Sequence, residues 1–378
     1  MDSSQKLTNT DVKKLNKNRI FRLIYNSDKI SRQEIADRLG LSLPTVNQNL
    51  KMLMEDGLIE YVGNFTSTGG RRAQAITINN NARKAISVNI KADYINVDVV
   101  GLKGQIIYSM AVKAHFSKSS AYIEKLTDAV RHAVDYVGAD ADDILGVGVT
   151  VPGILDDEKQ ILISAPPLKA KNYDFTRLIS AIDYPVVVMN DARAEAYADH
   201  WFNGKPEDEK IYIMLGEGVG GAYINASAIR NGVHNRGGEF GHMVIHPGGK
   251  QCLCGKKGCL EAYVSEKVLS SELDMTLDNF FELAAQGNKN NSNVLDEYMD
   301  NLALGINNIY TMMDCDIVLG GTVAPYLKQY ESSIKERLVN DYSFDTDADY
   351  LRISDGGGRK SGLGAALSFV ARFIDGVE

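Results

Sequence analysis

The sequence predicts an α/β protein with a small, mainly helical N-terminal domain followed by a longer body of two similar lobes. Up to about residue 80, apolar residues recur at helical spacing before two short alternating strands; beyond that point alternating strands dominate, and a strand–turn–strand unit occurs twice. A chain of 378 residues has room for two or three domains. We place the domains at 1–80 and 81–378, and the lobes of the body at about 81–190 and 191–378.

Composition limits the classes of protein to which the chain can belong. Apolar residues make up 44% and charged residues 24%, as in ordinary folded proteins. No run approaches the roughly 18 apolar residues that span a membrane, and the first residues lack the apolar core of a secretory signal. We expect a cytoplasmic protein that has no membrane partner.

Charge is distributed unevenly between the two domains. Residues 1–80 contain 12 Lys and Arg against 8 Asp and Glu, whereas the rest of the chain contains 29 against 41. A basic domain on an acidic body is typical of a polyanion-binding module joined to a body with another task. Chance asymmetry is the alternative.

The N-terminal domain is predicted to contain three helices. The second begins at a capping box, in which the Ser31 hydroxyl and the Glu34 carboxylate satisfy each other's backbone donors, and it ends at Gly40. Ser42 then begins the third helix. The buried stripe of the first helix is Ile20, Leu23 and Ile24, and that of the third is Val46, Leu50 and Leu53.

The opposite face of the third helix is rich in amide side chains. Asn and Gln can bond adenine edges in the major groove of DNA, while Lys favours phosphate or guanine. The second and third helices of the domain are short and joined by a tight turn, and the third has a polar face, so together they make a helix-turn-helix. The candidate DNA contacts here are Pro44, Thr45, Asn47, Gln48 and Lys51.

Two alternating strands, 57–62 and 75–78, follow the helices and flank a Gly-rich basic tip. Arg71 and Arg72 at this tip suit a narrow minor groove or phosphates. Because the pieces occur in the order of a winged helix-turn-helix, we predict operator DNA as the partner of this domain. A small helical docking domain with a solvated loop is the alternative.

The body is predicted to be a duplicated α/β fold with a cleft between its lobes. Ligands of α/β sheets bind beyond the carboxyl ends of strands, and both Val151-Pro152-Gly153 and Asn190-Asp191 lie at such ends. The expected strands are 85–90, 94–100, 105–115, 145–151 and 185–189 in the first lobe, and 211–215, 222–225, 316–319 and 350–353 in the second, with a helix near 119–137 and mainly helices after 263.

Three cysteines between residues 252 and 259 predict a metal site, because cysteine is too rare for this cluster to be expected by chance. Structural zinc takes four nitrogen or sulfur ligands and then has no open position. His242 is the nearest plausible fourth ligand, and His246 and His234 are competitors. Cys315, before a buried strand, is expected to be part of the core.

The run Gly238-Glu239-x-Gly241-His242, followed by Cys252-x-Cys254-Gly255-x-x-Gly258-Cys259-x-Glu261, resembles the signature of the ROK family of repressors, open reading frames and sugar kinases. Asn190-Asp191-Ala192 and Leu319-Gly320-Gly321 match further landmarks of that family. The resemblance covers the whole chain, because family repressors carry an N-terminal winged helix. It implies a two-lobed, actin-like sugar-kinase fold, a C-terminal helix packed on the first lobe, and a dimer or tetramer.

The resemblance also implies the site residues. The structural zinc would be held by His242, Cys252, Cys254 and Cys259, and a sugar or sugar phosphate would lie between the lobes. In the family's kinases, the residue that matches Asp191 takes the proton of the attacking hydroxyl. For Asn190-Asp191 alone, a helix N-cap is the simpler interpretation. The implied sugar contacts are Asn190, Asp191, Glu239, His242 and Glu261.

Two turns argue against kinase activity. The family's Asp-x-Gly-Gly-Thr-Lys turn is replaced here by Asn89-Ile90-Lys91-Ala92-Asp93-Tyr94, and its Gly-Thr-Gly turn by Gly216-Glu217-Gly218. Asp93 and Glu217 add carboxylates that oppose a triphosphate, and a Walker P-loop is absent from the sequence. Pro167 also stands where family kinases tend to carry a sugar-contacting Asn.

We therefore predict a sugar-responsive DNA-binding regulator, most simply a repressor, with a non-catalytic body. Two alternatives stay open: an active sugar kinase with a DNA-binding domain, and a DNA-bound scaffold whose body binds a protein partner.

Overall fold

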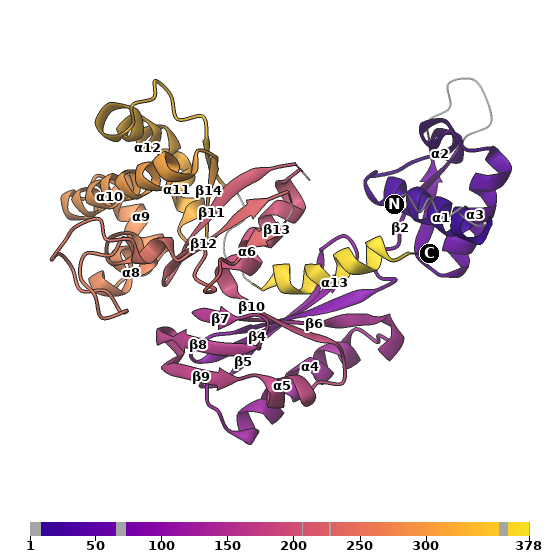
Figure 1. The fold of residues 1–378 in the computed structure, drawn as a ribbon, viewed down its shortest axis with the longest axis horizontal. Coiled ribbons are helices and arrows are strands. Elements are labelled where there is room, and N and C mark those ends of the chain that lie inside the picture. Colours follow the sequence, from indigo (N-terminus) through magenta and orange to yellow (C-terminus); the bar gives the residue numbers. More distant parts are fainter. Residues whose placement is uncertain (1–8, 66–72, 206, 227, 355–361, 378) are drawn as a thin grey trace, which may run out of the picture.

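A computed structural model of the chain describes residues 9–65, 73–205, 207–226, 228–354 and 362–377. Figure 1 shows an N-terminal domain set to one side of two larger lobes. None of the helices in these ranges is both long enough and apolar enough to cross a membrane. The N-terminal domain consists of α1 (Asn9–Tyr25), α2 (Arg32–Leu39), α3 (Leu43–Glu55), β1 (Ile59–Asn64) and β2 (Gln74–Ile78).

The N-terminal domain forms the predicted winged helix. Val46, Leu50 and Leu53 of α3 are almost fully buried. The Ser31 and Ser42 hydroxyls accept backbone N–H bonds at the starts of α2 and α3. The capping box is only half formed, because the Glu34 carboxylate pairs with Arg38 one turn later. β1 and β2 pair antiparallel, as the wing requires.

The first lobe is built on a five-stranded sheet in the order β10-β6-β3-β4-β5. The central strand β3 is buried along its whole length. It pairs antiparallel with β4 and parallel with β6, and β5 and β10 complete the two edges. The strands are β3 (Lys84–Ile90), β4 (Tyr94–Gly101), β5 (Ile106–Lys113), β6 (Ile144–Val151) and β10 (Val186–Asn190), and α4 (Ser120–Tyr136) packs against β4 and β5.

The second lobe repeats this topology. Its sheet has the order β13-β12-β11-β14-β15, with β11 antiparallel to β12 and parallel to β14. The repeated strand–turn–strand unit in the sequence therefore corresponds to a duplicated sheet. The strands are β11 (Glu209–Leu215), β12 (Val219–Asn225), β13 (Ala228–Arg230), β14 (Asp316–Gly320) and β15 (Leu351–Ile353).

Each lobe carries further elements that the strand pattern did not indicate in detail. In the first lobe these are β7 (Ile154–Asp156), β8 (Ile161–Ala165), β9 (Ala170–Asp174) and α5 (Thr176–Ser180). In the second they are α7 (Glu261–Val264), α8 (Glu266–Leu269), α9 (Leu277–Ala285), α10 (Lys289–Met313), α11 (Ala324–Leu327) and α12 (Glu331–Arg337).

Two helices cross between the lobes. α6 (Asp191–Asn203) follows β10 of the first lobe but packs on β11 and β12 of the second. α13 (Leu363–Asp375) follows the second lobe but packs on β6 and β3 of the first (Figure 1). A Cβ atom at Gly148 of β6 would lie 2.3 Å from the Ala365 backbone, so this close approach requires glycine. α6 and α13 also pack against each other, so they link the two lobes.

The far ends of both crossing helices contact α1 of the N-terminal domain. Phe21 lies edge-on to Phe373 of α13, with ring centroids 6.4 Å apart. Tyr25 lies edge-on to Trp201 of α6, with centroids 6.2 Å apart, and its hydroxyl donates to the Leu102 carbonyl at 2.8 Å. The N-terminal domain is therefore seated on the same two helices that join the lobes.

Candidate functional site

A cavity of about 360 Å³ lies between the lobes. It is lined by the β3–β4 turn, the end of β6, the start of α6 and the β11–β12 turn, so it lies beyond the carboxyl ends of strands, as expected for an α/β fold. All five residues predicted as sugar contacts line it: Asn190, Asp191, Glu239, His242 and Glu261.

Asn190 closes β10 and caps α6. Its side-chain oxygen accepts the Arg193 N–H at 3.0 Å, and its Nδ2 donates to the Gly153 carbonyl at 2.9 Å. The simpler interpretation of this residue, a helix N-cap, is therefore correct. The cap also fixes Asn190 in the cavity wall, so the two interpretations do not exclude each other.

Asp191, the first residue of α6, is almost completely buried. Its Oδ1 accepts the Ala192 N–H at 2.9 Å, and its Oδ2 lies 3.9 Å from the Lys91 Nζ. Burial raises the pKa of the Asp191 carboxyl above its ordinary value; the Lys91 ammonium acts to lower this pKa and Glu217 to raise it. The site thus holds a carboxylate that costs free energy to keep charged.

Glu195 lies one turn further along α6 and is also buried. Its carboxylate accepts the Tyr212 hydroxyl at 2.9 Å and the Gly321 N–H at 2.7 Å. Gly321 belongs to the predicted landmark Leu319-Gly320-Gly321, so Glu195 ties that loop of the second lobe to α6. Burial raises the pKa of Glu195.

On the other wall, Glu239, His242 and Glu261 face the cavity together. The His242 Nε2 lies 3.7 Å from the Glu239 Oε2. Glu261 accepts the Val219 N–H at 3.0 Å through Oε2. Hydrogen-bond acceptors from the two lobes thus converge on one space, an arrangement suited to a ligand with several hydroxyl groups.

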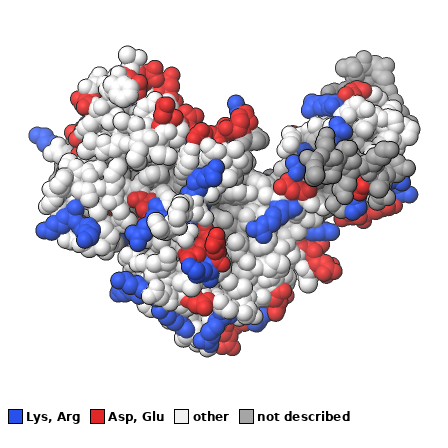
Figure 2. All heavy atoms as spheres, viewed as in Figure 1, with Lys and Arg blue, Asp and Glu red and all other residues white. Residues whose placement is uncertain are grey.

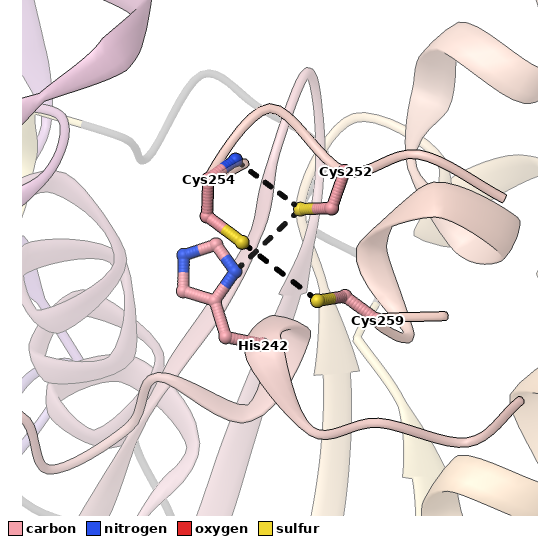
Figure 3. Close-up of side chains that lie close together, drawn as sticks. All are labelled: His242, Cys252, Cys254 and Cys259. Carbon is pink, nitrogen blue, oxygen red and sulfur yellow. Dashed lines mark hydrogen bonds between the residues drawn. The ribbon is translucent and has the colours of Figure 1, made fainter. Parts of the chain in front are cut away.

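His242 and the three cysteines form one cluster (Figure 3). One ligand atom from each of the four residues lies within 4.8 Å of the other three. The Cys254 and Cys259 sulfurs are 3.8 Å apart, as are the Cys252 sulfur and the His242 Nδ1. Tetrahedral zinc with Zn–S bonds of about 2.3 Å places its sulfurs about 3.8 Å apart, so the donor set fits the ion.

The rival histidines lie outside this cluster. The His246 Nε2 is 2.6 Å from the Asn301 Oδ1, and His234 is exposed. The loop can fold back because Gly258 has φ +84°, and a Cβ atom there would lie 1.8 Å from the His246 carbonyl oxygen. Cys315 is partly buried against the core of the second lobe.

Sequence reasoning missed the position of Lys91 beside Asp191. In the sequence, Lys91 counted only as a replaced glycine in a phosphate-binding turn. In the fold, its ammonium projects into the cavity from the first lobe, while Glu217 lines the same cavity from the second. The sequence offered one signal, a lysine in a turn expected to line the cleft. Only the fold brings Lys91 and Asp191 together.

Five of the predicted DNA contacts lie on α3, which Figure 1 shows on the outer side of the N-terminal domain. Thr45 is half-buried, with its hydroxyl 2.8 Å from that of Ser42, and the Lys51 Nζ lies 3.7 Å from Glu55. Figure 2 shows one face of the whole molecule, on which acidic and basic side chains are interspersed. Arg71 and Arg72 lie outside the described residues. The exposed candidates are Pro44, Asn47, Gln48 and Lys51.

Comparison with known families decides the classification of the body. The model of the ROK family matches residues 85–370. This chain belongs to the ROK family. A winged helix-turn-helix DNA-binding model matches residues 15–60 in addition. The resemblance predicted from the motifs is confirmed, and so is the two-part fold.

Individual ROK proteins support the same architecture. The xylose repressor of Bacillus subtilis (strain 168) is 29% identical over 319 residues, which cover 82% of each chain. The crystal structure of a ROK family transcriptional regulator, described as a homolog of the Escherichia coli Mlc protein, matches with a TM-score of 0.75 and 22% identity over 97% of this chain and 98% of that chain. A ROK glucokinase from Streptomyces griseus, in complex with glucose and AMPPNP, matches with a TM-score of 0.63 and 25% identity over 75% of this chain and 98% of that chain.

Proposed function

We propose that this chain is a sugar-responsive transcriptional repressor whose ROK body binds a sugar but transfers no phosphate. The observation that carries this proposal is the combination of two modules in one chain. A winged helix-turn-helix exposes the polar face of α3, and it is attached to a ROK body in which the five predicted sugar contacts line one cavity.

The sugar site is assigned to Asn190, Asp191, Glu239, His242 and Glu261. Carboxylates accept sugar hydroxyls in strong, charge-assisted hydrogen bonds. Zinc, when bound to His242, Cys252, Cys254 and Cys259, would act as a structural crosslink and fix the histidine ring. With Nδ1 of His242 turned toward Cys252, Nε2 lies on the side of Glu239 and the cavity.

Kinase activity is the second candidate, because the family includes sugar kinases. The side chains in the two turns that replace the family's phosphate-binding turns bear on this candidate. Glu217 occupies the β11–β12 turn, and Asp93 is exposed in the β3–β4 turn. Glu217 adds negative charge to the cavity, whereas Asp93 pairs with His115 and is not part of the cavity lining, so Glu217 is the carboxylate that would oppose a bound triphosphate. In an assay that couples ADP release to NADH oxidation, we expect no turnover with a panel of hexoses and pentoses.

The crossing helices connect the proposed sugar site to the DNA-binding domain, and this connection is how a sugar would regulate DNA binding. The predicted sugar contacts Asn190 and Asp191 start α6, and Trp201 at the far end of α6 contacts Tyr25 of the N-terminal domain. A sugar that draws the lobes together would therefore shift α6, and with it the surface on which the N-terminal domain packs. In a dimer this would change the spacing of the two domains on symmetric half-sites. Such coupling requires that the sugar bind the two states with different affinity.

The test is a DNA titration by fluorescence anisotropy at moderate salt. The probes are promoter fragments next to the protein's own gene and a scrambled duplex of equal length. We expect specific binding to one fragment and a change in its affinity when one sugar of a panel is added. A protein that prefers none of the fragments, or whose binding ignores every sugar and sugar phosphate, would contradict the proposal. In the latter case calorimetry with candidate transporter proteins tests the scaffold alternative.

A further inference from the structure

We propose that Lys91 is a ligand-contacting residue that selects an unphosphorylated sugar, because its ammonium and the Asp191 carboxylate hold one sugar hydroxyl between them. This inference rests on the proposed function and narrows its ligand from sugars and sugar phosphates to neutral sugars. It assigns Lys91 a binding role in the loop that family kinases use for phosphate.

The distance between the two groups fits a bridging oxygen. The Lys91 Nζ and the Asp191 Oδ2 are 3.9 Å apart, whereas a direct charge-assisted hydrogen bond is about 2.7–2.9 Å long. An oxygen about 2.8 Å from both atoms forms a triangle with a nearly right angle at the oxygen, which a hydroxyl accommodates. The hydroxyl would donate its proton to Asp191 and accept a hydrogen bond from Lys91.

The protein holds both partners in place for this contact. The Asp191 Oδ1 accepts from the Ala192 N–H at 2.9 Å and from Asn190 Nδ2 at 3.3 Å, so Oδ2 is the oxygen that faces Lys91. The Lys91 backbone N–H donates to the Tyr94 carbonyl at 2.9 Å and closes the β3–β4 turn. The Lys91 side chain is 38% exposed. The turn therefore fixes the Lys91 backbone, from which the side chain reaches the cavity.

The charges around this pair favour a neutral ligand. The residues that line the cavity include Asp191, Glu195, Glu217, Glu239, Glu261 and Glu266, against the ammonium groups of Lys91 and Lys267. A phosphate ester would meet this excess of carboxylates. At neutral pH, where its dianion predominates, it would also bring only acceptors, so the Asp191 Oδ2 would lose its donor. A hydroxyl offers one donor and one acceptor site and satisfies both partners.

The experiment is isothermal titration calorimetry of the full chain. Wild-type protein is titrated with D-xylose, D-glucose, D-mannose and N-acetyl-D-glucosamine, with the phosphate ester of whichever binds, and with the set of its monodeoxy analogues. Lys91→Met keeps an unbranched side chain, one atom shorter than lysine, and removes the charge. Lys113→Met, at an exposed lysine of β5 outside the cavity lining, is the matched control.

We expect Lys91→Met to weaken binding of the neutral sugar roughly tenfold to a hundredfold, as for the removal of a hydrogen bond to a charged group. Lys113→Met should bind like the wild type. The weakening should disappear for the one deoxy analogue that lacks the bridging hydroxyl, a result that general misfolding would not produce. The phosphate ester of that hydroxyl should bind wild-type protein more weakly than the free sugar does.

Two results would overturn the inference while leaving the proposed function intact: equal sugar affinity in Lys91→Met and wild type, or tighter wild-type binding of the phosphate ester than of the sugar. If wild-type protein binds no sugar or sugar phosphate, the proposed function fails, and this inference fails with it.

Discussion

Asp191 illustrates how a residue proposed to bind sugar can oppose stability. Its carboxyl is almost fully buried, and burial raises its pKa. A raised pKa in the folded state means that Asp191 favours folding most below the pKa of the unfolded chain, and that this contribution is lost as the pH rises through the folded pKa. At neutral pH the charged form therefore lowers the stability of the empty protein.

We predict that Asp191→Asn raises the free energy of unfolding at pH 7.5, by on the order of 1 kcal/mol, because the amide needs no buried charge. The gain should be smaller at pH 5, where the wild-type carboxyl is closer to its neutral form. Sugar binding should be abolished. Urea unfolding at both pH values and calorimetry check this, and a variant that is less stable than wild type at pH 7.5 would refute it.

On α3, the amide side chains are predicted to read bases. Asn47→Ala or Gln48→Ala should weaken operator binding by about 1–3 kcal/mol for each base that the removed amide recognises, and relax the sequence preference at one operator position. Lys51→Ala should instead weaken binding to all sequences and lower the salt dependence. Anisotropy titrations on an operator and its point variants distinguish these effects; uniform weakening by Gln48→Ala would count against base readout.

The loop that carries Cys252, Cys254 and Cys259 is the proposed zinc-binding element. Its turn exposes Cys254, while Cys252 and Cys259 are buried, so an ion bound by all three would tie the exposed turn to the buried part of the loop. We predict that Cys254→Ser loses zinc and lowers the melting temperature by several degrees, since a bound ion stabilises the folded state. Cys315→Ala, outside the cluster, should keep its zinc. Elemental analysis and thermal unfolding measure both, and zinc-free wild-type protein would exclude the assignment.

At the scale of elements, local patterns were sufficient where neighbours in sequence interact. The spacing of Val46, Leu50 and Leu53 predicted α3, and a cap at Asn190 predicted the start of α6. The small sheet of β7, β8 and β9 was not predicted, because its strands are short and only partly alternating. The pairing of Lys91 with Asp191 depends on the packing of two distant strands, which no local pattern contains.

The family motifs predicted more of the site than residue periodicity did. They placed Glu239 and Glu261 beside His242, and these residues line one cavity in the fold. They implied that the C-terminal helix packs on the first lobe, but not that α6 packs on the second lobe or that both helices contact the N-terminal domain. That arrangement depends on helices packing against surfaces far away in sequence, such as the close approach of α13 to Gly148.

At the scale of the whole molecule, the contacts of Tyr25 with Trp201 and of Phe21 with Phe373 join the N-terminal domain to the body. We predict that Trp201→Ala leaves sugar affinity within about twofold of wild type but reduces the effect of sugar on operator affinity several-fold. Tyr136→Ala, an exposed aromatic residue on α4, is the control and should preserve the response. An unchanged sugar response in Trp201→Ala would show that α6 does not carry the signal.

The central claim is that a sugar in the cavity between the lobes, without any nucleotide, sets the affinity of the N-terminal domain for DNA. The most direct measurement is operator affinity of the wild-type protein with the sugar that raises its melting temperature, with ATP and magnesium alone, and with both together. We predict that the sugar alone changes operator affinity at least about tenfold, a coupling typical of allosteric proteins, and that ATP adds nothing. A sugar response that requires ATP, or that proceeds with release of ADP, would contradict the claim.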